Sequence, residues 1–323
     1  MKTFNYALMA GLCLGLCCGG CVPKAKVTVR IVDDNNQPIS DAIVAVNGFN
    51  DKRQGGTDKD GCFTAKLRGV TGQLDLNVKK QGFYTIWWYS YFFKTHTNNQ
   101  WIPWNPTIEL QLHKIGKPVP MVVKNVEDYL PVLDSPVGYD LSVGDWVAPY
   151  GKGAINDFIF KADRQLVNDW TYSGTLSLNF SAPADGLILH RLWYRDDYEL
   201  RLGAQAPLGG YSNQWAFVVR SSPNPTNGLR YDYRSFSEDD NYYFRVRSQT
   251  NASGEIISAR YGKIYRGIHY AVGDTNINYV AGRTNPMPWV RFDYYLNPDG
   301  TRNTEFDTRS NLCPNPGTIG GKP

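Results

Sequence analysis

Acidic side chains are the first residues in this sequence whose type and spacing could support catalysis. They form two clusters: RDDYE contains Asp196, Asp197 and Glu199, and SEDDN spans 237–241. A glycosidase needs two carboxylates about 5 to 10 Å apart across the scissile bond. Asp197 and Glu199 would face the same side of a strand, because side chains alternate along it. A carbohydrate-active hydrolase is therefore one hypothesis. Both clusters fall at expected strand ends or turns, and we favour solvated loop charge.

Other catalytic and ligand-binding patterns lack support in the sequence. The four histidines are not spaced as in HExxH or HxH, and no GxSxG motif occurs. The glycines of GKG at 151–153 lack the strand-to-helix setting of a phosphate loop. DKDG at 58–61 begins like a calcium loop, but the twelfth position holds Gly69 instead of glutamate. We expect no metal, cofactor or nucleotide, and a non-catalytic protein.

The most unusual segment is aromatic. Residues 84–93 read YTIWWYSYFF, and WIPWNP follows at 101–106. On an extended strand, alternate residues project to opposite faces. The expected faces are Thr85, Trp87, Tyr89, Tyr91 and Phe93 on one side, and Tyr84, Ile86, Trp88, Ser90 and Phe92 on the other. Neither face is polar, so one should pack in a core and the other needs a cover or a ligand.

Three interpretations of the second face remain open. We favour burial against the protein's own second domain, with WIPWNP as part of the cover. Aromatic rings also bind pyranose rings by stacking, which makes Trp87, Tyr89, Trp101 and Trp104 candidate glycan-binding residues. Contact with a membrane is the third interpretation, since an exposed apolar patch marks an interaction site.

Composition favours strands over helices. The chain has 323 residues, of which 14% are aromatic, and it contains 31 Gly and 19 Pro. This bias is typical of strands joined by turns, and the length suggests two domains. The net charge of +4 is small and its basic residues are interspersed with acidic ones, so we expect no nucleic-acid partner.

The first 21 residues, MKTFNYALMAGLCLGLCCGGC, have the charged start and short apolar region of a signal peptide. CCGGC resembles a bacterial lipobox, which makes Cys21 the expected site of lipidation; cleavage without lipid is the alternative. A lipid would tether the protein to the cell envelope, which we expect to be the outer membrane, facing the periplasm or the cell surface. Cys62 and Cys313 then remain, either as a disulfide or as two free thiols.

Short alternating strands separated by turns fill residues 24–115 and predict a β-sandwich. Four motifs occur in order: VTVRIVDD, QPISDAIV, TDKDGCF and LDLNVKKQGF. In this order they resemble the carboxypeptidase regulatory-like domain, a transthyretin-like β-sandwich. The resemblance implies a fold and an extracytoplasmic setting. It does not imply peptidase activity, because the family name refers to a companion module of carboxypeptidases.

A linker at 116–122 is expected from the prolines of GKPVPM. Residues 123–323 contain further strand patterns and predict a larger all-β domain of sandwich or jelly-roll type. AINDFIFKADRQL at 154–166 fits either a helix or a strand. YDLSVGDWVAPYGKG and YYLNPDGTRNTEFD resemble segments of environmental-bacterial lipoproteins, a resemblance that implies no mechanism. We therefore expect an envelope protein that binds glycans or envelope proteins, or a structural subunit of an envelope assembly.

Overall fold

The computed structural model describes residues 23–168, 170–193, 195–273 and 287–318. Within these ranges every regular element is a β-strand, and the strands form four sheets. The expected all-β fold class is confirmed. No helix in the described part of the chain is long and apolar enough to cross a membrane.

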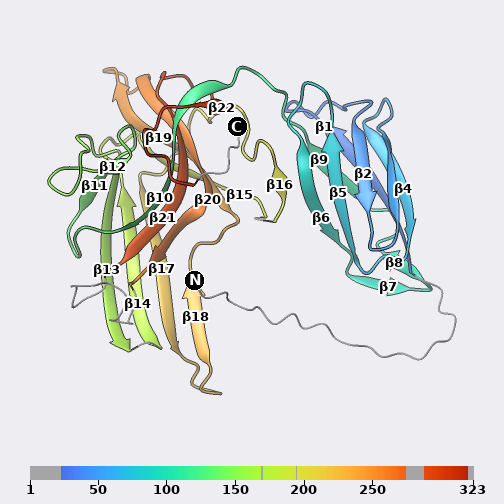
Figure 1. Cartoon of the computed structure of the whole chain (residues 1–323), viewed down its shortest axis with the longest axis horizontal. Helices are drawn as coiled ribbons and strands as arrows, with labels where there is room; N and C mark the ends of the chain where they lie inside the picture. Colours follow the sequence, from blue (N-terminus) through green and yellow to red (C-terminus); the bar gives the residue numbers. More distant parts are fainter. Residues whose placement is uncertain (1–22, 169, 194, 274–286, 319–323) are drawn as a thin grey trace.

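The first sandwich consists of two five-stranded sheets (Figure 1). One sheet has the order β4-β1-β8-β7, with β9 paired to β1 in parallel. Its strands are β1 (Lys24–Val32), β4 (Cys62–Arg68), β7 (Thr95–Thr97), β8 (Gln100–Ile102) and β9 (Thr107–Gln111). The other sheet has the order β16-β6-β5-β2-β3. Its strands are β2 (Ile43–Asn47), β3 (Lys52–Gly56), β5 (Gln73–Lys79), β6 (Ile86–Phe92) and β16 (Asp197–Tyr198).

Alternation along these strands produces the core of the first sandwich. Val27, Val29 and Ile31 on β1 are fully buried, and so are Leu74 and Val78 on β5. Their neighbours in sequence point away from the core, as a period of two requires. The core is aliphatic almost throughout, so its stability comes from burial of apolar surface.

The second sandwich consists of two six-stranded sheets. The first has the order β15-β19-β20-β21-β10-β22, with β10 (Val119–Tyr129), β15 (Gly186–Arg191), β19 (Asp240–Thr250), β20 (Ile256–Ala271), β21 (Trp289–Asn297) and β22 (Phe306–Asn311). The second has the order β12-β11-β13-β14-β17-β18, with β11 (Val137–Asp140), β12 (Asp145–Trp146), β13 (Phe158–Asn168), β14 (Thr171–Asn179), β17 (Gln214–Pro223) and β18 (Arg230–Arg234).

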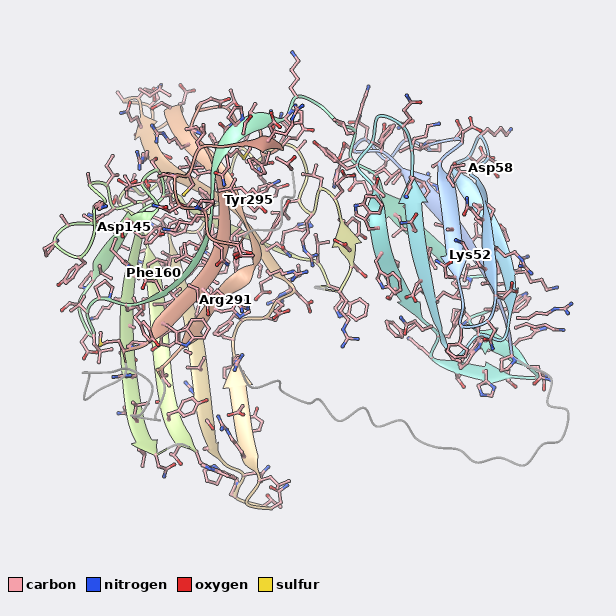
Figure 2. The ribbon with its side chains drawn as sticks, viewed as in Figure 1. Lys52, Asp58, Asp145, Phe160, Arg291 and Tyr295 are labelled. Carbon is pink, nitrogen blue, oxygen red and sulfur yellow. The ribbon has the colours of Figure 1, made fainter. Side chains whose placement is uncertain are left out.

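Aromatic rings fill the core between these two sheets. Phe158, which is fully buried, lies 5.5 Å from Phe180, 5.6 Å from Phe244 and 5.9 Å from Phe292, measured between ring centroids. Phe160, labelled in Figure 2, belongs to the same cluster. Edge-to-face pairs of this kind add to the stability that burial supplies.

The second sandwich contributes a strand and a carboxylate to the first. β16 belongs to a loop of the second sandwich, yet it pairs with β6 at the edge of the first (Figure 1). Glu305 is buried and accepts hydrogen bonds from the Tyr84 hydroxyl at 3.1 Å and from the Gly116 amide at 2.7 Å. These contacts fix how the two sandwiches sit against each other.

Several local predictions are settled by the strands. Residues 158–168 form β13, so the strand alternative for 154–166 holds. β10 begins at Val119, inside the expected linker, and its pairing with β22 is irregular between Val119 and Met121, where Pro120 lacks an amide donor. The Asp58–Gly61 turn joins β3 to β4, which belong to the two different sheets of the first sandwich.

Candidate functional site

The aromatic strand β6 contains a β-bulge that the sequence did not reveal. Leu76 pairs with Tyr89, and Val78 pairs with Ile86, so Asn77 alone faces the two residues Trp87 and Trp88. The Asn77 side chain donates a hydrogen bond to the Trp87 carbonyl at 3.0 Å. An extra residue in one strand reverses the side-chain alternation at that point. Both tryptophans therefore point away from the core.

The expected assignment of faces is consequently wrong for the first half of the run. Ile86 is buried in the core, although it was placed with Trp88 and Phe92. Beyond the bulge the prediction holds, because Tyr89 packs against the core. The two-faced burial expected for the run is also wrong: Trp87, Trp88 and Phe92 are 46%, 45% and 50% exposed.

We call Trp87, Trp88 and Phe92 the aromatic surface. A polar network on β5 and β6 orients one of its rings. The Trp88 indole donates to the Ser90 hydroxyl at 3.0 Å, and that hydroxyl donates to Asp75 at 2.9 Å. The Lys79 ammonium lies 4.7 Å from the Trp87 ring centroid, a cation–π contact. Fixing a ring before a ligand arrives lowers the entropic cost of binding.

The loop of the second sandwich that carries β16 borders the aromatic surface. Trp193 makes an edge contact with Phe92, with 5.5 Å between ring centroids. Asp196 accepts a hydrogen bond from the Ser90 amide at 3.2 Å, and burial raises the pKa of its carboxyl to about 6. The second sandwich thus covers the edge of β6 but leaves the aromatic surface open to solvent.

The four predicted glycan-binding residues do not come together. Trp87 lies on the aromatic surface, whereas Tyr89, one strand position past the bulge, packs inward. Trp101 lies on β8 in the other sheet, where its indole donates to the Val70 carbonyl at 2.8 Å. Trp104 follows β8 in the chain and is half-buried. WIPWNP therefore does not cover β6. Trp88, Phe92 and Trp193 were not among the predicted residues. Alternation gives no sign of the bulge that turns Trp88 outward, and the contact of Trp193 with Phe92 depends on how the two sandwiches dock.

The acidic clusters hold the structure together. The Glu199 carboxylate accepts a hydrogen bond from the Thr85 amide at 2.7 Å, next to the contact between Asp196 and Ser90. Asp197 belongs to β16 and pairs with Trp88 through the backbone. In the second cluster, Asp240 is buried and bonded to Arg191 at 3.0 Å. Among the described residues, no group of three or more His, Cys, Asp or Glu side chains is arranged to hold a metal ion.

The two cysteines among the described residues, Cys62 and Cys313, are free thiols. Cys62 lies on β4 of the first sandwich, and Cys313 lies in the core of the second. The disulfide considered from the sequence is therefore not formed. Cys21, the expected lipidation site, lies outside the described residues.

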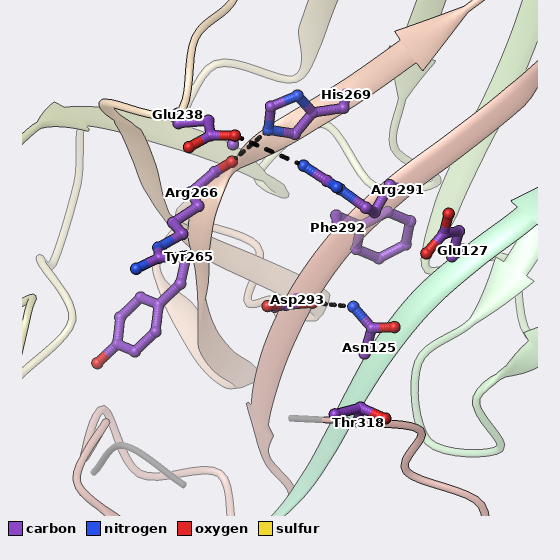
Figure 3. Close-up of a pocket in the computed structure, with 11 residues that line it drawn as sticks. Asn125, Glu127, Glu238, Tyr265, Arg266, His269, Arg291, Phe292, Asp293 and Thr318 are labelled. Atoms are coloured by element: carbon purple, nitrogen blue, oxygen red, sulfur yellow. Dashed lines mark hydrogen bonds and ion pairs between the residues drawn. The ribbon is translucent and has the colours of Figure 1, made fainter. Parts of the chain in front are cut away.

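A second candidate site is a polar pocket of about 360 Å³ on the second sandwich (Figure 3). Arg291 lies 3.8 Å from Glu238 across it, and Asn125 donates to Asp293 at 2.5 Å. Arg266, at a bulge in β20, has no hydrogen bond or ion pair from its guanidinium to a described residue. The pocket offers charged donors and acceptors, but its Phe292 is buried in the core and unable to stack on a ligand.

Comparison with known proteins places the chain in no family. A scan of protein-family models and a search of curated proteins both gave no match. A 3-chlorocatechol 1,2-dioxygenase from Rhodococcus opacus 1CP aligns over 29% of this chain and 61% of its own, less than two thirds of its length, at 11% identity and a TM-score of 0.24.

Two other solved structures align over most of this chain. The major pilin subunit of Bacillus cereus aligns over 87% of this chain and 99% of its own, at 11% identity and a TM-score of 0.23. A carbohydrate-binding candidate from Bacteroides uniformis aligns over 83% and 96%, at 13% identity and a TM-score of 0.18. Superpositions this loose assign neither a fold family nor a function.

Proposed function

We propose that this protein is a non-catalytic lipoprotein of the bacterial cell envelope that binds a carbohydrate polymer through the aromatic surface of its first sandwich. The observation that carries the proposal is the β-bulge in β6. It turns two adjacent tryptophans to the same solvent-facing side, next to Phe92. An aromatic side chain that is half exposed contributes little to folding and is available to a ligand.

Sugar rings match this surface chemically. The C–H face of a pyranose stacks on an aromatic ring, and its hydroxyls need donors and acceptors nearby. Asp75, Ser90 and Lys79 supply such groups between and beside the rings. A row of rings on an open sheet face suits a repeating polymer better than a single sugar, because a polymer can contact several rings at once.

The proposal also includes a cellular location and a family for the first sandwich. The signal segment ending at Cys21 supports a lipid anchor in the envelope, with the protein facing the periplasm or the cell surface. The four ordered motifs at 24–115 support a carboxypeptidase regulatory-like assignment for the first sandwich. The acidic clusters favour a non-catalytic role, since Asp196 and Glu199 accept backbone hydrogen bonds that attach one sandwich to the other.

The test is retention on insoluble cell-wall polysaccharides and on a glycan array. We expect the intact chain to be retained, and the variant Trp87→Ala/Trp88→Ala/Phe92→Ala to lose at least about 90% of that retention, since each stacked ring contributes about 1 kcal/mol or more. Leu208→Ala is the matched control, because Leu208 is 73% exposed but lies on the second sandwich.

Two outcomes would remove the proposal. One is the absence of retention on every polysaccharide tested. The other is retention that the triple variant leaves unchanged, which would place the binding elsewhere. If detergent extracts instead contain the protein in a stable complex that survives the triple substitution, a structural role in an envelope assembly replaces glycan binding.

A further inference from the structure

The most exposed apolar side chains outside the aromatic surface include a group at the tips of loops and hairpins. Phe49 is 76% exposed, Val167 73%, Leu229 66% and Trp170 53%. We call these four the apolar tips. Large apolar side chains this open, at several points of one molecule, mark a surface that meets an apolar partner.

Three of the apolar tips belong to neighbouring hairpins of the second sandwich. Val167 is the second-last residue of β13, Trp170 directly precedes β14, and Leu229 lies in the connection between β17 and β18. The Ser221 hydroxyl donates to the Trp170 carbonyl at 3.1 Å, and Trp170 and Pro223 line a common hollow. Both hairpins extend to the lower end of the molecule in Figure 1.

The fourth apolar tip, Phe49, belongs to the first sandwich and lies near the start of β1. Phe49 is in the turn closed by the Gly48 amide and the Asp51 carbonyl, and the Asp51 side chain accepts from the Arg68 amide at 2.9 Å. The next amides along, those of Gly69 and Val70, donate to the Pro23 carbonyl. The turn that carries Phe49 and the start of β1 therefore occupy the same end of this sandwich.

In Figure 1 that end is the lower end of the first sandwich, and the hairpins of the second sandwich extend further down. Lys24 pairs with Gln100 of β8, which is drawn at the lower end of the first sandwich. Lys52, just after the Phe49 turn, lies lower than Asp58 in Figure 2. Only Val22 lies between Cys21 and Pro23, so these two residues are at most about 7 Å apart along an extended chain. A lipid on Cys21 would hold this end of the molecule against a bilayer.

Basic residues are concentrated around the apolar tips and the start of β1. The segments at this end are 23–26, 48–53, 66–70, 94–102, 161–168, 170–175 and 220–234. Their described residues include twelve Lys and Arg and three Asp, whereas the whole chain has a net charge of only +4. Asp51 and Asp232 pair with Arg53 and Arg230, which leaves most of the described basic side chains in these segments without an acidic partner there. Attraction to anionic headgroups adds to burial of the tips, and tryptophan and tyrosine favour the interfacial zone.

We infer that this end of the molecule is a membrane-docking face: the apolar tips insert into the headgroup region of an anionic bilayer while the surrounding basic side chains contact the lipid headgroups. Two separate contacts, one from each sandwich, hold the protein in one orientation. Trp87 and Trp88 lie near the start of β6, away from the segment 94–102 that follows the strand, so docking leaves these two rings free for a glycan.

Flotation with lipid vesicles tests the inference without the lipid anchor. The chain from Val22 onward contains every described residue and lacks Cys21. We expect it to float with vesicles of phosphatidylethanolamine and phosphatidylglycerol and to remain in the bottom fraction with vesicles of phosphatidylcholine. Adding 0.5 M salt should release it from the anionic vesicles. Val167→Ser/Trp170→Ser/Leu229→Ser should lower the partition coefficient roughly tenfold or more, since three apolar contacts are lost.

The controls separate docking from folding and from glycan binding. Ile257→Ser and Leu208→Ser remove equally exposed side chains elsewhere on the second sandwich and should float like the unaltered chain. The tip variant should keep its polysaccharide retention, and the aromatic-surface variant should keep its flotation. Three outcomes would each overturn the inference. In the first, the tip variant floats as well as the unaltered chain. In the second, vesicle binding does not depend on lipid charge. In the third, the protein forms a dimer in solution that the tip substitutions dissociate.

Discussion

The two sandwiches use aromatic residues in opposite ways. In the second sandwich, Phe158 and Phe160 are fully buried and contact other rings, so they stabilise the fold. In the first, the core is aliphatic and the large rings of β6 lie half exposed on the outer face. Rings used for stability are packed on every side, whereas rings available to a ligand keep one face free.

Polar groups show the same division. The second sandwich buries Lys263, whose amine has no hydrogen-bond partner among the described residues, and the ion pairs of Arg247 with Asp140 and Asp157. In the first sandwich, Ser90 and Asp75 lie toward the outer face, where the Ser90 hydroxyl accepts from the Trp88 indole and orients it. Substitutions should therefore change stability in one sandwich and binding in the other.

The largest expected effect is Phe158→Ala. Because the ring is fully buried among four others, its loss should reduce the free energy of unfolding by about 3 to 5 kcal/mol. Trp88→Ala should cost less than about 1 kcal/mol, since the ring is already 45% exposed. Urea unfolding measures both. If both substitutions lowered the free energy of unfolding by the same amount, the two sandwiches would not differ in how they use aromatic rings.

Arg247→Met should have the next largest effect. The Asp157 carboxylate is fully buried and Arg247 bonds both of its oxygens at 2.7 Å. Removing the guanidinium leaves two buried carboxylates with backbone amide donors but no counter-charge, which should cost roughly 3 kcal/mol. Arg309→Met is the control, because Arg309 is 88% exposed in its pair with Asp307 and should change stability by less than about 0.5 kcal/mol. A small loss for Arg247→Met would show that water reaches the pair.

Lys263→Met is expected to stabilise the second sandwich. The lysine is fully buried between the rings of Tyr265 and Tyr295, and burial lowers the pKa of its amine well below the ordinary value. Replacing an unpartnered polar group with an apolar side chain of similar length should raise the free energy of unfolding by about 2 kcal/mol. Lys66→Met, at an exposed position, should have no such effect. Destabilisation by Lys263→Met would reveal a partner for the amine.

The smallest expected effect concerns the joint between the sandwiches. Burial raises the pKa of Asp196 to about 6, above the ordinary 3.8, so folding favours the protonated carboxyl. The corresponding stability is fully present below about pH 4 and is lost as the pH rises through 6, a change of roughly 1 to 2 kcal/mol. Thermal unfolding between pH 4 and 7 should show this slope, and Asp196→Asn should remove it. An unchanged slope in that variant would assign the titration to another group.

Fold class was predictable because alternation is local. Val27, Val29 and Ile31, separated by polar residues, specify a strand with one buried face regardless of what packs against it. The hairpin of β19 and β20 was predictable for the same reason, since NASGE forms a turn between two alternating segments.

The candidate site was predictable only in part. The run at 84–93 identified the right strand, but Trp88 and Phe92 were overlooked and Trp101 and Trp104 were wrongly grouped with it. A bulge depends on how two strands pair across a sheet, and no pattern within one strand specifies it. The contribution of Trp193, from more than a hundred residues away, depends on the docking of two sandwiches.

Residue type and period along the chain were enough to predict that it folds into strands and that its richest aromatic segment is one of them. These features act through neighbours in sequence. Which rings remain open to solvent depends on the folded arrangement of distant segments. The bulge at Trp87 and Trp88 reversed their direction, and the loop bearing β16 covered the strand edge while leaving its face exposed. Exposure depends on contacts between distant segments, and those contacts exist only in the folded molecule.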